Sequence, residues 1–123
     1  MLLYFAIAAA PAAEPSLLMR IALKYEVWKL TFTQWAMFSD RELHINLGLL
    51  VFFLAMILLR KPMQSVWPVL AVILFEAVNE YLGMVLKGSW DWQDTKLDIL
   101  FTLLWPVLFF LAARIGAIKS RAP

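Results

Sequence analysis

The sequence predicts an all-α integral membrane protein with three transmembrane helices and an amphipathic interfacial helix before them. Of the 123 residues, 63% are hydrophobic, whereas a soluble domain is about 45–50% apolar. Three apolar runs also reach the length of about 20 residues that a helix needs to cross a hydrocarbon core about 30 Å thick. A chain of this size is expected to form a single membrane domain over residues 1–123.

The N-terminal part divides into two segments, neither of which is expected to cross the bilayer. Residues 1–15 form an apolar segment that is too short to span and that ends at Pro11 and Pro15. Residues 16–38 place basic side chains on one side of a helix and aromatic side chains about a quarter-turn away. Adjoining basic and aromatic stripes favour a helix that lies in the membrane interface. The alternative is a helix packed on the spans of a larger assembly.

The first transmembrane helix is predicted over residues 40–60. It begins at the capping box Ser39-Asp-Arg-Glu42, in which the serine and the glutamate can each bond the other's backbone amide. It ends at Arg60-Lys61-Pro62, because two charges and a proline do not continue an apolar helix.

The second and third transmembrane helices are predicted over residues 66–87 and 95–118. Pro68 stands in the first turn of the second helix, where proline is tolerated. Gly88 can close that helix, and Pro106 is expected to kink the third. Lysines and arginines slightly favour the 60–65 turn and the C-terminus in the cytoplasm, with the intervening loop outside.

Composition narrows the classes of partner. The chain contains no cysteine, so cysteine-ligated zinc and iron–sulfur sites are excluded. The net charge is only +2 and the basic residues form no run, so no nucleic-acid partner is expected. The expected partners are membrane lipids and, because three spans enclose little volume, copies of the chain or a larger membrane complex.

Polar residues interrupt the second predicted span. Glu76 lies near its middle, where a carboxylate costs about 2.5–3.5 kcal/mol to insert, so such residues usually face a bundle interior or a cavity. Asn79 and Glu80 share its helical face because they follow at spacings of three and four. Gly83 continues this face and is expected to permit close helix approach. Burying Glu76 is expected to require a second chain.

The loop after this span carries three aspartates, and the whole set predicts one ligand or cation pocket open to the loop side. The candidate residues are Glu76, Asn79, Glu80, Asp91, Asp94 and Asp98. Their oxygens suit a hard divalent cation such as Mg²⁺ or Ca²⁺, with Glu80, Asp94 and Asp98 as candidate metal ligands. They also suit the amine of a lipid headgroup, or a general base acting on a hydroxyl. Two such carboxylates are expected to share a proton or a cation.

Each candidate also has a purely structural interpretation. Asp94 can act as a helix N-cap, and Asp91 and Glu80 can be solvated charges. Glu76 can be a protonated side chain bonded across helices. His44 is expected to be an interfacial residue rather than a ligand.

Residues 75–98 resemble the VanZ-like membrane protein family. That family has a helix with a glutamate and an amide residue, then an aromatic–Asp–two residues–Asp–three residues–Asn pattern. Here EAVNE matches the first part and WDWQDTKLD the second, with Asp98 in place of the asparagine. Gly88-Ser89 replaces an arginine, and Thr102 and Trp105-Pro106 replace glycines. The resemblance implies a protein of the bacterial inner membrane, in a family linked to glycopeptide resistance.

The order of elements is also similar to that of small bacterial diacylglycerol kinases. Glu42, Glu76, Asn79 and Asp98 occupy comparable places, but Gly83 stands where those kinases have a glutamate. This resemblance implies a lipid phosphotransferase as an alternative function. A non-catalytic accessory subunit of a membrane complex is a further alternative, and the sequence leaves open whether the protein is an enzyme.

Overall fold

The computed structural model describes residues 14–121, and every regular element in that range is a helix. The helices are α2 (Leu17–Ala36), α3 (Asp40–Leu59), α4 (Val66–Lys87) and α5 (Trp92–Arg121). The last three are each long and apolar enough to cross a membrane. This confirms an all-helical protein with three candidate membrane-spanning helices. The predicted apolar segment at residues 1–15 lies outside the described residues, apart from its last two.

Short polar side chains fix where the helices begin. The capping box of α3 is formed, with the Glu42 amide 3.2 Å from the Ser39 hydroxyl and the Ser39 amide 2.8 Å from the Glu42 carboxylate. The α5 helix begins at Trp92, earlier than the predicted residue 95. The reason is that Asp91, not Asp94, caps it: the Asp91 carboxylate accepts from the Asp94 amide at 3.3 Å.

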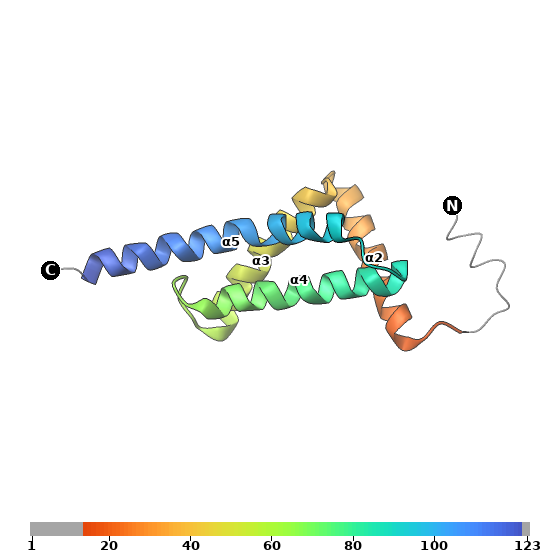
Figure 1. The fold of residues 1–123 in the computed structure, drawn as a ribbon, viewed down its shortest axis with the longest axis horizontal. Coiled ribbons are helices and arrows are strands. Elements are labelled where there is room, and N and C mark those ends of the chain that lie inside the picture. Colours follow the sequence, from red (N-terminus) through yellow and green to blue (C-terminus); the bar gives the residue numbers. More distant parts are fainter. Residues whose placement is uncertain (1–13, 122–123) are drawn as a thin grey trace.

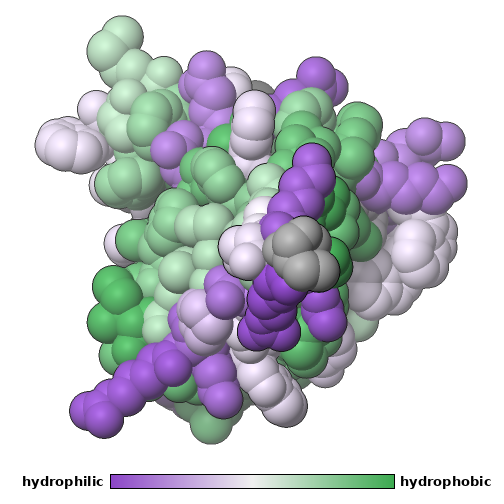
Figure 2. Space-filling view, turned by 90° about the vertical axis from the view of Figure 1, so that its left-hand side faces the viewer, coloured by the Kyte–Doolittle hydropathy of each residue, from purple (hydrophilic) through white to green (hydrophobic). Residues whose placement is uncertain are grey.

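The three long helices pack on one another, and α2 crosses them at one end. Figure 1 shows α4 and α5 running along the long axis of the molecule, with α3 oblique to both. The α2 helix packs on α4 near the end where α4 finishes and α5 begins. Figure 2, seen from the end where α5 finishes, shows hydrophobic residues on the sides and hydrophilic ones near the C-terminus.

Gly48 allows α3 and α5 to approach closely. The sequence had instead indicated Gly83 as the glycine at a close helix contact. Gly48 faces the backbone of α5, so a Cβ added there would overlap the carbonyl oxygen of Thr102. A Cβ added at Gly83 would meet no described atom within 4 Å. The expected close approach at Gly83 is therefore wrong, because that glycine points into open space. Gly48 instead sets the position of Thr102, which belongs to the site described below.

We expect Gly48→Ala to lower the free energy of unfolding by about 1–3 kcal/mol, the usual cost of overpacking a filled core. The clash is with backbone, which cannot rotate away as a side chain can. Gly83→Ala is the matched control and should leave stability unchanged or raise it, because alanine is the better helix former. Thermal unfolding of both variants in the same detergent measures the difference. Equal stabilities would show that α3 and α5 are not in contact at Gly48.

Candidate acidic site at one end of the helix bundle

A cavity of about 430 Å³ lies at the end of the bundle where α4 is followed by α5. All four described helices contribute to its lining. From the described residues, six carboxylates and two lysines line it: Glu26, Asp40, Glu80, Asp91, Asp94, Asp98, Lys29 and Lys87. Because carboxylates outnumber basic groups, the cavity favours a cationic ligand.

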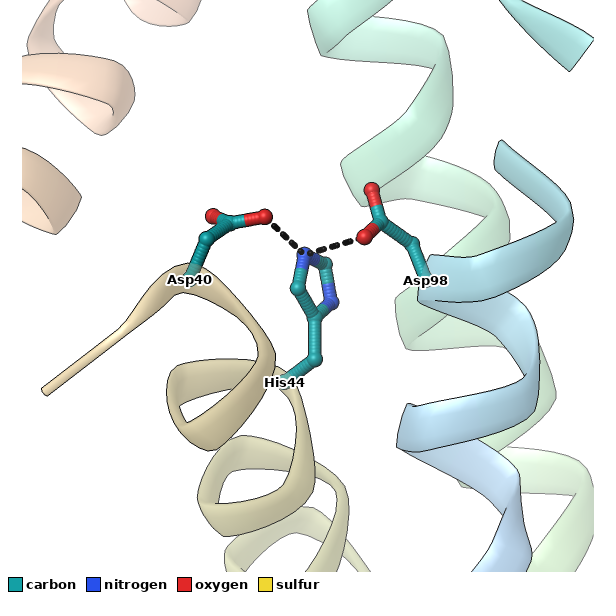
Figure 3. Close-up of side chains that lie close together, drawn as sticks. All are labelled: Asp40, His44 and Asp98. Atoms are coloured by element: carbon teal, nitrogen blue, oxygen red, sulfur yellow. Dashed lines mark ion pairs between the residues drawn. The ribbon is translucent and has the colours of Figure 1, made fainter. Parts of the chain in front are cut away.

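His44 lies at the inner wall of this cavity and is only 4% exposed. Its Nε2 atom is 3.3 Å from Oδ1 of Asp98 and 3.8 Å from Oδ2 of Asp40. Figure 3 shows Asp40 on α3 and Asp98 on α5 approaching the imidazole from opposite sides. The other ring nitrogen, Nδ1, is 3.1 Å from the Thr102 hydroxyl. One imidazole therefore links two helices through polar groups.

Glu76 lies beside both Thr102 and His44, at 2% exposure. The Thr102 hydroxyl donates to its Oε2 atom at 3.0 Å, and Nδ1 of His44 is 3.6 Å from the same atom. A hydroxyl carries one proton, so Thr102 must accept from Nδ1–H of His44 while it donates to Glu76. The second oxygen of Glu76, Oε1, is buried with no hydrogen-bond partner among the described residues.

Asn79 and Glu80 connect the same site to α2 and to the start of α5. The Thr95 hydroxyl donates to Glu80 at 2.7 Å, and the Asn79 amide donates to Glu80 at 3.4 Å. The Asn79 oxygen accepts from the Tyr25 hydroxyl at 2.8 Å and from Lys29 at 3.2 Å. These two bonds fasten α2 to the bundle.

The environment of Tyr25 reflects the acidity of this region. Burial, with the nearby carboxylates of Glu76, Glu26 and Glu80, raises the pKa of Tyr25 from 10.0 to about 12. The phenol therefore keeps its proton throughout the physiological range and donates its hydrogen bond to Asn79.

The structure brings some of the six predicted residues together and leaves others at the rim. Glu76, Asn79 and Asp98 are buried, and Glu80 is half-buried beside them. Asp91 and Asp94 line the outer part of the cavity, where Asp91 caps α5 and Asp94 pairs with Lys87 at 3.6 Å.

The predicted arrangement of metal ligands differs from the observed one. Glu80, Asp94 and Asp98 were the candidates, but the close group of three among the described residues consists of Asp40, His44 and Asp98. His44 is also placed between Glu76 and Asp98, so these two carboxylates meet an imidazole rather than each other. His44, interpreted from the sequence as an interfacial residue rather than a ligand, has its ring buried in the bundle, because α3 turns it toward α5.

Two threonines that were not among the six candidate residues, Thr95 and Thr102, complete the site. Thr95, Asp98 and Thr102 follow at spacings of three and four, so one face of α5 presents all three toward α3 and α4. Asp40 and His44 likewise stand four residues apart on α3. A search for polar residues at helical spacing within each span would have found both sets.

A single chain is enough to bury Glu76. We expected this burial to require oligomerisation, but the carboxylate is 2% exposed within one copy. The helix α3 covers it, because His44 and Thr102 close the space between α3, α4 and α5.

The fold and the site together define a class of protein: a helical chain with three membrane-spanning candidates and an acidic cavity at one end. No family model, curated protein or solved structure matches this chain.

Proposed function

We propose that this chain is a multi-pass protein of the bacterial inner membrane that binds a lipid-linked substrate through a cationic amine headgroup. The observation that carries the proposal is that the acidic cavity adjoins an apolar one. A second cavity of about 260 Å³ shares Glu80, Trp90 and Thr95 with the first. Its remaining lining is mainly apolar: Ile73, Glu76, Ala77, Trp92, Ile99 and Leu103.

Adjoining cavities of opposite character suit an amphiphile. A headgroup amine in the acidic cavity would meet several carboxylates, and part of its chain would cover the apolar surface between α4 and α5. Glu80 stands at the junction, with one carboxylate oxygen held by Thr95 and the other by Asn79. It is therefore the residue best placed to pair with the amine. The resemblance of residues 75–98 to VanZ-like proteins also supports a role in the bacterial envelope.

The position of α2 supports binding at the membrane surface. Its aromatic side chains form a continuous row from Tyr25 through Trp28 and Phe32 to Trp35, with ring centroids about 6 Å apart. Trp35 is 80% exposed, and tryptophan is enriched at headgroup depth. We propose that α2 lies in the interface beside the cavity, so that a lipid headgroup reaches the carboxylates from the bilayer surface.

The alternative function of lipid phosphotransferase fits the acidic cavity less well. A phosphotransferase must hold nucleotide phosphates, which the surplus of carboxylates repels unless divalent cations intervene. Membership of a homo-oligomer or of a larger membrane complex stays a prediction, and it is compatible with lipid binding.

We expect the purified protein to bind phosphatidylethanolamine in preference to phosphatidylglycerol, because only the first carries an amine. Native mass spectrometry in mild detergent measures both lipids on the same sample. Glu80→Gln removes one charge at the junction and should weaken binding of phosphatidylethanolamine about tenfold or more. Glu14→Gln is the control: it removes the same charge from a side chain that is 91% exposed and outside the cavity.

Equal binding of the two lipids would reject the amine as the recognised group. Equal loss in both variants would show that binding depends on net charge rather than on the cavity.

A further inference from the structure

We propose that Asp40, His44 and Asp98 form a zinc site in the wall of the acidic cavity. The site would take a borderline metal ion through one imidazole nitrogen and two carboxylate oxygens. This inference goes beyond the lipid ligand, and each can hold or fail without the other.

The spacing of the three side chains fits a tetrahedral ion. Two ligands that are each about 2.1 Å from such an ion lie about 3.4 Å apart. Nε2 of His44 is 3.3 Å from Asp98 and 3.8 Å from Asp40, and all three candidate ligand atoms lie within 4.8 Å of one another. Only a small movement of Asp40, whose side chain is largely exposed, is needed to close the site.

The hydrogen bonds on the Nδ1 side of His44 favour the tautomer whose Nε2 atom is free to bind a metal ion. Nδ1–H donates to Thr102, and Thr102 donates to the buried Glu76. A histidine that binds metal usually donates its other ring proton in this way, often toward a carboxylate. With the proton on Nδ1, the lone pair of Nε2 points at Asp40 and Asp98. A lone pair facing two carboxylates is repelled unless a proton or a metal ion lies between them.

Charge favours the metal ion over the proton. Asp40, Asp98 and Glu76 surround a single imidazole, and the Oε1 atom of Glu76 is buried without a partner among the described residues. A proton on Nε2 would offset one of these three negative charges, whereas a divalent ion offsets two. Glu76 is not one of the three proposed ligands. Its burial beside His44 is therefore a separate observation from the distances between the ligand atoms.

The donor set favours zinc over the hard cations that oxygen ligands alone would suggest. Magnesium and calcium prefer six or more oxygen ligands, whereas imidazole nitrogen suits zinc and its transition-metal neighbours. All three residues also line the 430 Å³ cavity. Three protein ligands beside a cavity leave a fourth position open to water or to a bound ligand, as in catalytic zinc sites.

The test is zinc binding to the purified full-length protein after treatment with a chelator. Isothermal titration should show one Zn²⁺ per chain, and Co²⁺ in its place should give the visible absorption of tetrahedral cobalt. His44→Ala and Asp98→Asn should abolish both signals. Thr102→Val keeps all three ligands but removes the orienting hydroxyl, so it should weaken binding by about 10–100-fold.

Two further variants keep the test independent of folding. Asp40→Asn changes an exposed side chain in the first turn of α3, so it should fold normally and still lose most of the affinity. Asp94→Asn is the control, because Asp94 lines the same cavity but pairs with Lys87. It should bind Zn²⁺ as the unaltered protein does. The zinc site is rejected if no one-to-one binding occurs, if Mg²⁺ competes equally, or if Asp40→Asn binds as tightly as Asp94→Asn.

Discussion

Glu76→Leu is expected to lower the free energy of unfolding by about 3 kcal/mol, the lower end of the cost of removing one partner from a buried charged pair. Glu76 is 2% exposed, and its carboxylate accepts from Thr102 beside His44. Leucine would leave the hydroxyl without an acceptor and the imidazole without its nearest carboxylate on that side. In a lipid-facing position the same change would instead stabilise the protein, because it removes a carboxylate from hydrocarbon.

Glu76→Gln keeps the shape of the side chain and removes its charge, so it separates the effects of these two properties on stability. The glutamine oxygen can still accept from Thr102, so we expect this variant to fold and to lose about 1 kcal/mol. Glu14→Leu, at a side chain that is 91% exposed, is the control for the change in hydrophobicity. Unfolding in mixed micelles of rising denaturing-detergent content gives the three values under one condition. A Glu76→Leu variant as stable as the unaltered protein would contradict the inward position of Glu76.

The polar face of α4 could be predicted because it depends on one helix alone. The spacing of Glu76, Asn79 and Glu80 fixes their common face before any packing is known. The cost of a carboxylate in hydrocarbon then predicts that this face turns inward. The inward position of Asp98 could be predicted by the same reasoning, since Asp98 also has apolar neighbours in the sequence.

The partners of these residues could not be predicted in the same way. Whether His44 faces lipid or the bundle depends on how α3 is rotated against α5, and hydrophobicity does not set this rotation when nearly every side of the helix is apolar. The rotation is set by Gly48, the position at which α3 can approach the Thr102 backbone. Gly48 and Gly83 look alike in the sequence, so the geometry alone distinguishes the glycine that packs from the glycine that does not.

The roles of the two threonines and of the Asp91 cap of α5 did not follow from the sequence, for a different reason. A threonine is tolerated almost anywhere in an apolar helix, so the only sequence signal of Thr95 and Thr102 is their helical spacing from Asp98. The start of α5 was misplaced because Asp91 and Asp94 are both good N-caps. In the structure, Gly88 ends α4 at φ 74°, and the Asp91 carboxylate accepts from the Asp94 amide and caps α5.

The arrangement of three spans predicts that the two loops beside α4 lie on opposite sides of the membrane. The 22 residues of α4 extend about 33 Å at 1.5 Å per residue, which matches a hydrocarbon core about 30 Å thick. Because the chain has no native cysteine, single-cysteine variants can be labelled in intact cells with an impermeant maleimide. We expect Ser89→Cys to react from outside, and Gln64→Cys to react only after the membrane is opened.

Ser120→Cys, near the end of α5, is the control and should behave as Gln64→Cys does. Labelling of Gln64→Cys and Ser89→Cys from the same side would show that α4 does not cross the membrane, and a reversed pattern would keep the three spans but invert their orientation.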